Sequence, residues 1–184
     1  GVGLLRSQDG GTNWTLLEDT IGDQRWLLHG VTISPNYQVD QTLFVFTDRR
    51  IYKSTNRGNT WSLVRDQLTN IQNLVLSPNY ANDNTALASI DDCTGEADLW
   101  KTTDGGLTWN SLAQSVNFCG IRSVAFSPNY ATDAVIFVGS NWGGVYRSTD
   151  AGLNWTLVLE EHFNWSVAFS PAYDLDQTLF VSQN

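Results

Sequence analysis

The chain has 184 residues, of which 41% are apolar and 16% charged, a composition typical of a globular protein of about one domain. Ten Lys and Arg against 19 Asp and Glu give a net charge of −9, which argues against nucleic acid or an anionic membrane surface as partner, because both reward clustered basic residues. No apolar run approaches the roughly 20 residues of a membrane helix, and without a signal peptide or an initial Met we expect a mature product or an excised piece.

Short runs of apolar, β-branched and aromatic residues follow one another along the chain, each bounded by Gly, Pro, Asn or Asp, and such runs are typical of β-strands. The chain opens with two predicted strands, at 4–6 and 14–17. A four-strand unit then occurs three times, and one more pair, at 166–169 and 178–181, ends the chain. The predicted strands of the three full units are 30–33, 42–45, 51–53 and a run from 61; 73–76, 85–88, 99–101 and a run from 109; and 123–126, 134–138, 145–147 and a run from 155.

The first two strands of each unit are separated by an S-P-x-Y motif, and all four prolines of the chain belong to it. Pro, Asn and Asp clustered over a few residues indicate a turn. The motif and the residues after it occupy 34–40, 77–83, 127–133 and 170–176.

The third and fourth strands are separated by an eight-residue box, S/T-x-D/N-x-G-x-T/N-W, which occurs four times. Its tryptophans stand at 14, 61, 109 and 155, which gives a period of 47, 48 and 46 residues. The shared positions are held by Ser7, Asp9, Gly11 and Trp14; Ser54, Asn56, Gly58 and Trp61; Thr102, Asp104, Gly106 and Trp109; and Ser148, Asp150, Gly152 and Trp155.

We interpret the box as structural. Its Asp or Asn and its hydroxyl can accept hydrogen bonds from turn amides, its Gly suits a positive φ, and its Trp packs on the sheet. The competing interpretation, a calcium ligand or a catalytic acid, is weakened because the residue recurs once per unit in the same local frame.

Four-stranded units at a period of about 40–50 residues are typical of β-propeller blades. We predict an all-β propeller of antiparallel blades, with a single propeller segment over 1–184 divided into a half-blade at 1–18, blades at 25–66, 71–114 and 119–161, and a half-blade at 164–184. From the serine of S-P-x-Y to the next box is 20, 25 or 21 residues. Joining the ends of the chain would give 21, so one blade is split between the termini.

Three arrangements fit this split blade. The chain could close on itself as a four-bladed ring, two copies could exchange half-blades in an eight-bladed ring, or the chain could be a segment of a longer array. Because an open end leaves an unpaired sheet edge, we expect both half-blades to be completed by something.

The box resembles the Asp-box, or BNR repeat, of sialidases, sortilin-type luminal domains, xyloglucanases and photosystem assembly factors. The resemblance covers the whole chain, and one copy departs from it in having Asn56 for Asp. It implies a β-propeller with the box between the third and fourth strands of each blade, and it implies no single activity, since this repeat serves enzymes and binding proteins alike. Because such propellers usually have more than four blades, the four-bladed ring is the less favoured arrangement.

The loops between the second and third strands and the links between blades should share one edge of the blades, where a regular scaffold concentrates binding. A disulfide between Cys93 and Cys119 is plausible there, and Asn13, Asn154 and Asn164 begin glycosylation sequons. The candidate binding residues on this edge are Trp26, Arg49, Arg50, Asp91, Asp92, Glu96, Trp142 and Trp165.

No nucleophile motif, phosphate loop or metal-ligand spacing is present, so we predict no catalytic residue, no cofactor and no metal. The Arg-Ile-Pro motif of sialidases is also missing, because every Pro belongs to an S-P turn. We therefore predict a non-catalytic binding or structural module that is extracellular, on the cell surface or periplasmic. Its partners would be a protein, a glycan, or further copies or segments that complete the propeller. The alternatives are a glycoside hydrolase, sialidase-like or xyloglucanase-like, or a part of one, and an assembly factor for a membrane complex.

Overall fold

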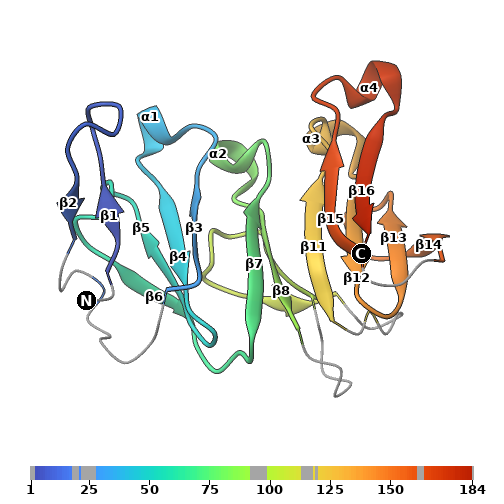
Figure 1. Ribbon diagram of the computed structural model, residues 1–184, viewed down its shortest axis with the longest axis horizontal. Helices are drawn as coiled ribbons and strands as arrows, with labels where there is room; N and C mark the ends of the chain where they lie inside the picture. The colour runs from blue at the N-terminus through green and yellow to red at the C-terminus, as the bar shows by residue number, and fades with distance from the viewer. Residues whose placement is uncertain are drawn as a thin grey trace.

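The computed structural model of the protein describes residues 3–17, 21, 28–91, 99–112, 118, 120–160 and 164–183, except for the side chains of 164 and 165. Five antiparallel sheets stand side by side in a row from the N-terminal to the C-terminal end (Figure 1). Three sheets have four strands and the two end sheets have two. Within the described ranges, no helix is long and apolar enough to cross a membrane.

Each four-stranded sheet is a meander in which strands adjacent in sequence pair with each other, and we call these sheets the first, second and third blades. The first blade is β3 (Gly30–Ile33), β4 (Leu43–Phe46), β5 (Ile51–Ser54) and β6 (Ser62–Arg65). The second is β7 (Ile71–Leu76), β8 (Ala86–Ile90), β9 (Leu99–Thr102) and β10 (Asn110–Ser111). The third is β11 (Ile121–Phe126), β12 (Ile136–Ser140), β13 (Gly144–Ser148) and β14 (Thr156–Leu159).

The N-terminal half-blade consists of β1 (Leu5–Arg6) and β2 (Thr15–Leu16), and the C-terminal half-blade of β15 (Asn164–Phe169) and β16 (Leu179–Gln183). The two half-blades lie at opposite ends of the row and do not pair with each other (Figure 1). The chain is therefore a partial propeller, and its ends do not close a four-bladed ring. The predicted blade boundaries stay predictions, since most of them fall outside the described residues.

Three first strands begin earlier than the sequence indicates. β7 starts at Ile71 and β11 at Ile121, and the register of each shifts before the predicted start, at Asn73 and Ser123. A third, β15, starts at Asn164 and has the same shift before Ser166. Such a bulge interrupts the alternation of buried and exposed residues on which the prediction depends. Each predicted strand therefore starts after the bulge.

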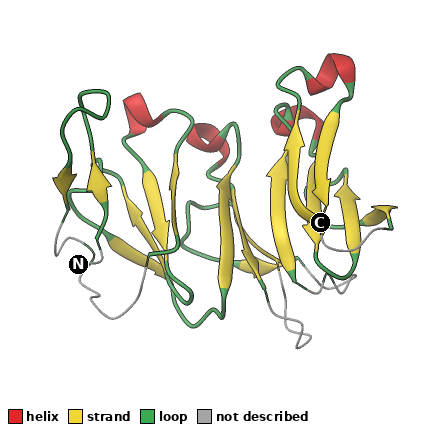
Figure 2. Ribbon diagram, in the orientation of Figure 1, coloured by secondary structure: helices red, strands yellow, loops and turns green. Residues whose placement is uncertain are grey.

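The S-P-x-Y segments form one turn of helix where the sequence predicts a turn (Figure 2). In the first blade, the backbone N–H of Gln41 donates to the Tyr37 carbonyl at 2.9 Å, and Gln41 ends the helix with a left-handed φ of 54°. The helix does not extend back through Ser34, because a residue that precedes Pro is disfavoured in the helical conformation. The four helices are α1 (Tyr37–Asp40), α2 (Tyr80–Asp83), α3 (Tyr130–Asp133) and α4 (Tyr173–Asp176).

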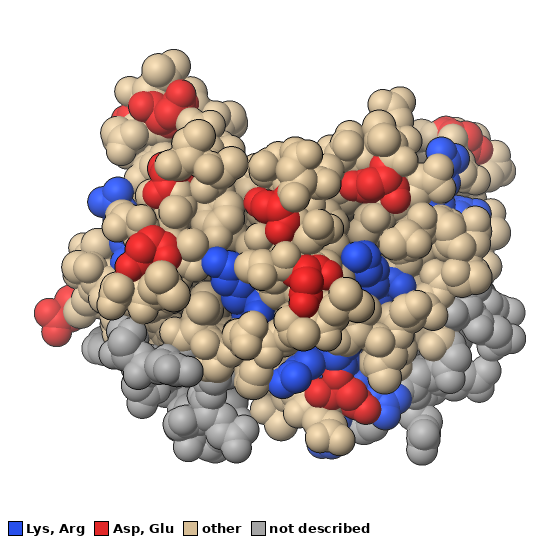
Figure 3. Space-filling model, turned by 180° about the vertical axis from the view of Figure 1, so that it is seen from behind, with Lys and Arg blue, Asp and Glu red and all other residues tan. Residues whose placement is uncertain are grey.

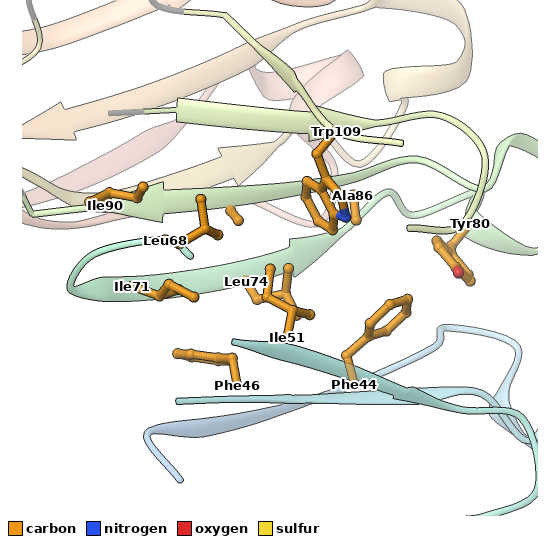
Figure 4. Packing of buried hydrophobic residues seen from close by; sticks show 11 residues of the cluster. Phe44, Phe46, Ile51, Leu68, Ile71, Leu74, Tyr80, Ala86, Ile90 and Trp109 are labelled. Carbon is orange, nitrogen blue, oxygen red and sulfur yellow. The ribbon is translucent and has the colours of Figure 1, made fainter. Parts of the chain in front are cut away.

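Neighbouring blades share a core. Phe44 and Ile51 of the first blade point toward Leu74 and Trp109 of the second (Figure 4), and all four side chains are buried. Burying a side chain of this size contributes roughly 1.5–3 kcal/mol. The blades thus stack face to face. One edge, the turn edge, carries the helices and the box turns (Figure 1). The opposite edge, the loop edge, carries the β4–β5 and β12–β13 connections and the described link at 66–70 between the first and second blades (Figure 1).

Candidate functional site

The box folds around its Ser or Thr and its Asp. In the third blade, Ser148 Oγ donates to Asp150 Oδ1 at 2.8 Å and accepts the backbone N–H of Gly152 at 2.8 Å. Asp150 Oδ1 also accepts the backbone N–H of Asn154 at 2.9 Å, and Oδ2 accepts its side-chain Nδ2 at 2.7 Å. The Gly152 backbone has a φ of 95°, a region that favours Gly. Both oxygens of the carboxylate thus accept hydrogen bonds from residues of the turn.

The one box with Asn keeps this arrangement. Asn56 Oδ1 accepts the Ser54 hydroxyl and the backbone N–H of Thr60, both at 2.9 Å. Its Nδ2 donates to Thr60 Oγ1 at 2.8 Å, whereas in the next box Thr108 Oγ1 donates to Asp104 Oδ2 at 2.6 Å. The Thr hydroxyl donates to the Asp and accepts from the Asn, so the turn tolerates Asp or Asn at this position.

These hydrogen bonds lower the pKa of the box carboxyls. The pKa of Asp9, Asp104 and Asp150 falls from 3.8 to about 2, chiefly because residues of the same turn donate to the carboxylate, Asn13, Thr108 and Asn154 respectively. A general acid that works near neutral pH needs a raised pKa instead. The box carboxylates are therefore suited to holding a turn and unsuited to proton donation.

The turn edge contains a second clamp, a Ser–Asp pair in each S-P-x-Y segment, where the sequence predicts only a turn. Ser77 Oγ donates to Asp83 Oδ2 at 2.6 Å, and Asp83 Oδ1 accepts the backbone N–H of Thr85 at 2.8 Å. The spacing of six residues between Ser and Asp was the available signal. The same pair recurs as Ser34–Asp40, Ser127–Asp133 and Ser170–Asp176, at 2.5, 2.5 and 2.6 Å.

Consecutive blades are tied through the boxes. Lys53 Nζ on β5 donates to the carbonyl of Gly105 in the box of the second blade at 3.0 Å. Lys101 Nζ on β9 donates to the carbonyl of Ala151 in the box of the third blade at 2.8 Å. Burial lowers the pKa of both lysines, with nearby carboxylates opposing the shift. The basic residue of the third strand thus links the first blade to the second and the second blade to the third.

The loop edge, where binding is predicted, is held by backbone bonds between loops and links. The N–H of Leu68 donates to the Arg49 carbonyl at 3.2 Å and that of Ile71 to the Asp48 carbonyl at 3.0 Å. The N–H of Asp91 in turn donates to the Asn70 carbonyl at 3.1 Å. These backbone hydrogen bonds fix the loops to the links between the blades.

Arginines form ion pairs with carboxylates that the structure describes at the loop edge. Arg122 Nη2 lies 2.9 Å from Asp91 Oδ2 and joins the third blade to the second, and Arg50 Nε lies 3.0 Å from Asp66 Oδ1. Arg49 Nε is 3.6 Å from Asp48. Acidic and basic groups are interspersed over the face of the molecule in Figure 3, and acidic groups are prominent toward the turn edge.

Two tryptophans add aromatic surface to the blades near this edge. The Arg65 guanidinium lies over the Trp100 ring, 4.4 Å from its centroid, across the first and second blades. Trp142, in the turn between β12 and β13, is 54% exposed. Of the predicted binding residues, Arg49, Arg50, Asp91 and Trp142 are described and spread over three blades. Trp26, Asp92, Glu96, the side chain of Trp165 and the pair Cys93 and Cys119 lie outside the described residues.

Two sequon asparagines belong to boxes. Asn13 Nδ2, the atom that a glycan would modify, donates to Asp9 Oδ2 at 2.6 Å, and Asn154 Nδ2 makes the same bond to Asp150. The Asn164 side chain is not among those described. Within the described ranges, no group of three His, Cys, Asp or Glu side chains is placed to hold a metal ion.

Comparison with known proteins identifies the family. The family model described as Sortilin-Vps10 (sortilin, neurotensin receptor 3) matches residues 3–141. The chain belongs to the Sortilin-Vps10 family. This family chain is 30% identical over 105 residues to a xyloglucanase of Hypocrea jecorina (strain QM6a), a match over 57% of the chain and 12% of that enzyme.

Solved structures similar to this Sortilin-Vps10 family chain are propellers, so the predicted Asp-box β-propeller is confirmed. The GH74 enzyme of Niastella koreensis superposes with a TM-score of 0.73 at 24% identity, over 98% of this chain and 30% of that one. YCF48 bound to D1 peptide superposes with a TM-score of 0.69 at 14% identity, over 98% of this chain and 55% of that one. The chain thus spans about an eighth of the curated relative and under a third of the GH74 enzyme.

Proposed function

We propose that this chain is a non-catalytic binding module that holds a glycan against its loop edge. The observation that carries the proposal is the pairing of the described carboxylates at that edge with arginines, above all Asp91 with Arg122 at 2.9 Å. Glycoside hydrolysis requires two carboxyl groups at a set separation, one of them with a raised pKa. A carboxylate neutralised by a guanidinium suits a fixed polar surface better than that chemistry.

The two edges of the blades differ in how much their residues vary from blade to blade, and this difference supports the same proposal. The turn edge repeats the same residues in each blade, and these are bonded to one another. The loop edge differs from blade to blade while resting on backbone bonds such as Asp91 N–H to Asn70. A varied surface on a rigid support is suited to recognition.

Trp142 supplies the apolar part of the proposed site. The residue is 54% exposed and lies on a short turn whose backbone is fixed by the bond from Asn141 N–H to the Gly120 carbonyl at 2.9 Å. An exposed, preorganised indole offers a broad apolar face, and a sugar ring presents a complementary apolar face. The similarity to a xyloglucanase favours a glucan over other glycans.

The proposal includes an extracytoplasmic location, where Cys93 and Cys119 would oxidise to a disulfide. Thiol titration of the denatured protein prepared without reductant tests this part. Less than one thiol per chain is expected, and two would contradict it.

The test of binding is calorimetric titration with xyloglucan oligosaccharides. Trp142→Ala should weaken binding about tenfold or more, as loss of a central aromatic contact does. Trp142→Phe should retain most of the affinity, and Leu107→Ala, at an exposed position of the turn edge, should change nothing. Absence of binding by the unaltered chain would overturn the glycan proposal, and binding of peptides in its place would favour a protein partner.

A second candidate, a glycoside hydrolase or a part of one, is favoured by the 30% identity to a xyloglucanase. Release of reducing sugar from xyloglucan distinguishes the two. Under the binding proposal, none is released. Turnover that is lost in Asp91→Asn, Asp92→Asn or Glu96→Gln would establish the hydrolase instead.

A further inference from the structure

We propose that Ser140 is the residue that positions Trp142 for binding, by fixing the turn between β12 and β13 on which Trp142 stands. This role rests on the proposed function, because it concerns the glycan site at the loop edge. Ser140 ends β12, and the turn occupies 141–143. Since Ser140 is fully buried, it touches no ligand and acts on one only through the turn.

The Ser140 hydroxyl forms hydrogen bonds to two different parts of the backbone. Its Oγ donates to the carbonyl of Phe118, in the segment that precedes β11, and accepts the backbone N–H of Gly143 at 3.0 Å. That N–H belongs to the peptide group that follows Trp142, so the bond restricts rotation of the Trp142 backbone. The direction in which the indole leaves the turn therefore depends on this hydroxyl.

A second hydrogen bond holds the backbone at the start of the turn. The N–H of Asn141 donates to the Gly120 carbonyl at 2.9 Å. Gly120 directly precedes β11 and has a φ of 75°, a conformation that favours Gly. The backbone is thus held on both sides of Trp142, by Gly120 before it and by Ser140 after it.

The residue that accepts the Ser140 hydroxyl is itself anchored in the core. The Phe118 ring is fully buried and meets the rings of Tyr146 and Trp155 edge-on, with centroids 5.2 and 5.1 Å away. A Cβ at Gly143 would lie 3.1 Å from Ser140 Oγ and 3.2 Å from the Phe118 carbonyl oxygen. Gly143 therefore lies directly against the two groups that fix the turn, and the turn is tied through them to the core of the third blade.

The first blade presents Arg49 by the same arrangement. Thr47 holds the position of Ser140 in the strand ladder, four places after the residue that pairs with the box Ser, and it is also buried. Thr47 Oγ1 accepts the backbone N–H of Arg49 at 3.1 Å and that of Arg50 at 2.9 Å. Arg49, like Trp142, is the second residue after the hydroxyl, and 56% of its side chain is exposed. In both blades a buried hydroxyl thus fixes a short turn that presents an exposed side chain.

Loss of the Ser140 hydroxyl should reduce the preorganisation of Trp142. With Ala at this position, Gly143 N–H and the Phe118 carbonyl lose their partner, and the turn gains freedom that binding must remove again. Ser140→Ala should therefore weaken the binding of xyloglucan oligosaccharides roughly two- to tenfold, the factor that corresponds to ordering one side chain. This loss is smaller than that expected for removal of the indole itself.

A double-mutant cycle tests whether Ser140 acts through Trp142. In calorimetric titration with xyloglucan oligosaccharides, Ser140→Ala should weaken binding in the chain that has Trp142 and have no further effect in Trp142→Ala. Ser77→Ala, which removes a buried hydroxyl of the turn edge, is the matched control for destabilisation and should keep the affinity of the folded protein. Equal losses in the two backgrounds, no loss in the first, or an equal loss in Ser77→Ala would overturn the proposal.

Amide hydrogen exchange of the unliganded chain, followed by NMR, tests the turn without any ligand. The Gly143 amide should exchange several-fold faster in Ser140→Ala, while the amide of Thr85, which donates to Asp83 Oδ1 at the turn edge, should exchange at an unchanged rate. If the unaltered chain binds no xyloglucan oligosaccharide, the glycan proposal fails, and faster exchange at Gly143 still supports Ser140 as the residue that fixes Trp142. An unchanged rate at Gly143 would overturn the positioning role, whether or not the chain binds a glycan.

Discussion

Lys53 Nζ donates to the carbonyl of Gly105 at 3.0 Å, across 52 residues of sequence and from one blade to the next. Gly105 lies in the box turn with a φ of 73°, and its carbonyl accepts this bond from outside its own hairpin. The box therefore both stabilises its own hairpin and accepts a hydrogen bond from the preceding blade.

We expect Lys101→Met to destabilise the fold. Lys101 Nζ donates to the Ala151 carbonyl at 2.8 Å and to Tyr130 Oη at 3.1 Å, and Met keeps most of the apolar stem while losing both bonds. A hydrogen bond to a charged group contributes about 1.5–3 kcal/mol, part of which is returned because the half-buried ammonium is no longer desolvated. Urea denaturation should show a loss of about 1 kcal/mol. Lys101→Arg should be nearly neutral, as Arg6 makes the same link, and an unchanged stability in the Met variant would contradict the role.

The box carboxylate should be replaceable by an amide and not by a methyl group. Asp104→Asn reproduces the arrangement of Asn56 with Thr60, so its urea midpoint should stay near that of the unaltered chain. Asp104→Ala removes the acceptor of Thr108 N–H, of Thr108 Oγ1 and of Thr102 Oγ1, and should lower the midpoint. Equal midpoints for the two variants would show that the turn does not depend on this acceptor.

Stability should fall with acid in a defined window. The pKa of Asp9, Asp104 and Asp150 is about 2 in the folded chain, against 3.8 ordinarily. Because folding lowers this pKa, the stabilisation is fully present above pH 3.8 and is lost as the pH falls toward 2. Thermal unfolding followed from pH 6 to pH 2 should show this decline, and Asp104→Asn should make it shallower. A decline that is identical in the variant would assign the acid sensitivity to other carboxyls.

We expect the loss of the buried Ser77 hydroxyl, which forms the second clamp, to destabilise the fold. Ser77 is fully buried, and it donates to Asp83 Oδ2 at 2.6 Å while accepting Asn79 N–H at 3.1 Å. Ser77→Ala leaves both partners unsatisfied and should cost about 1–3 kcal/mol in urea denaturation. Ser62→Ala, at an exposed position of β6, is the matched control and should change little. Similar values for the two would refute the clamp.

The repeat was predictable because its residues act within their own turn: Asp150 and Ser148 meet across one residue, so sequence spacing alone places them together. The Ser77–Asp83 pair was equally local and was missed because the motif was interpreted as a turn rather than as a helical turn with a carboxylate at its end. Contacts between blades could not be predicted, since Asp91 and Arg122 meet only through the stacking of two sheets. The bulges of β7 and β11 were hidden for a related reason, because a bulge breaks the periodicity that marks a strand.

The central claim is that the repeated residues hold the blades together while the loop edge carries the function. Its most direct test compares xyloglucan-oligosaccharide affinity and urea midpoint in Asp104→Ala and Trp142→Ala. We predict that Asp104→Ala lowers the midpoint and keeps the affinity of the folded protein, whereas Trp142→Ala loses about tenfold or more in affinity and keeps the midpoint. Loss of affinity in Asp104→Ala with binding retained in Trp142→Ala would contradict the account.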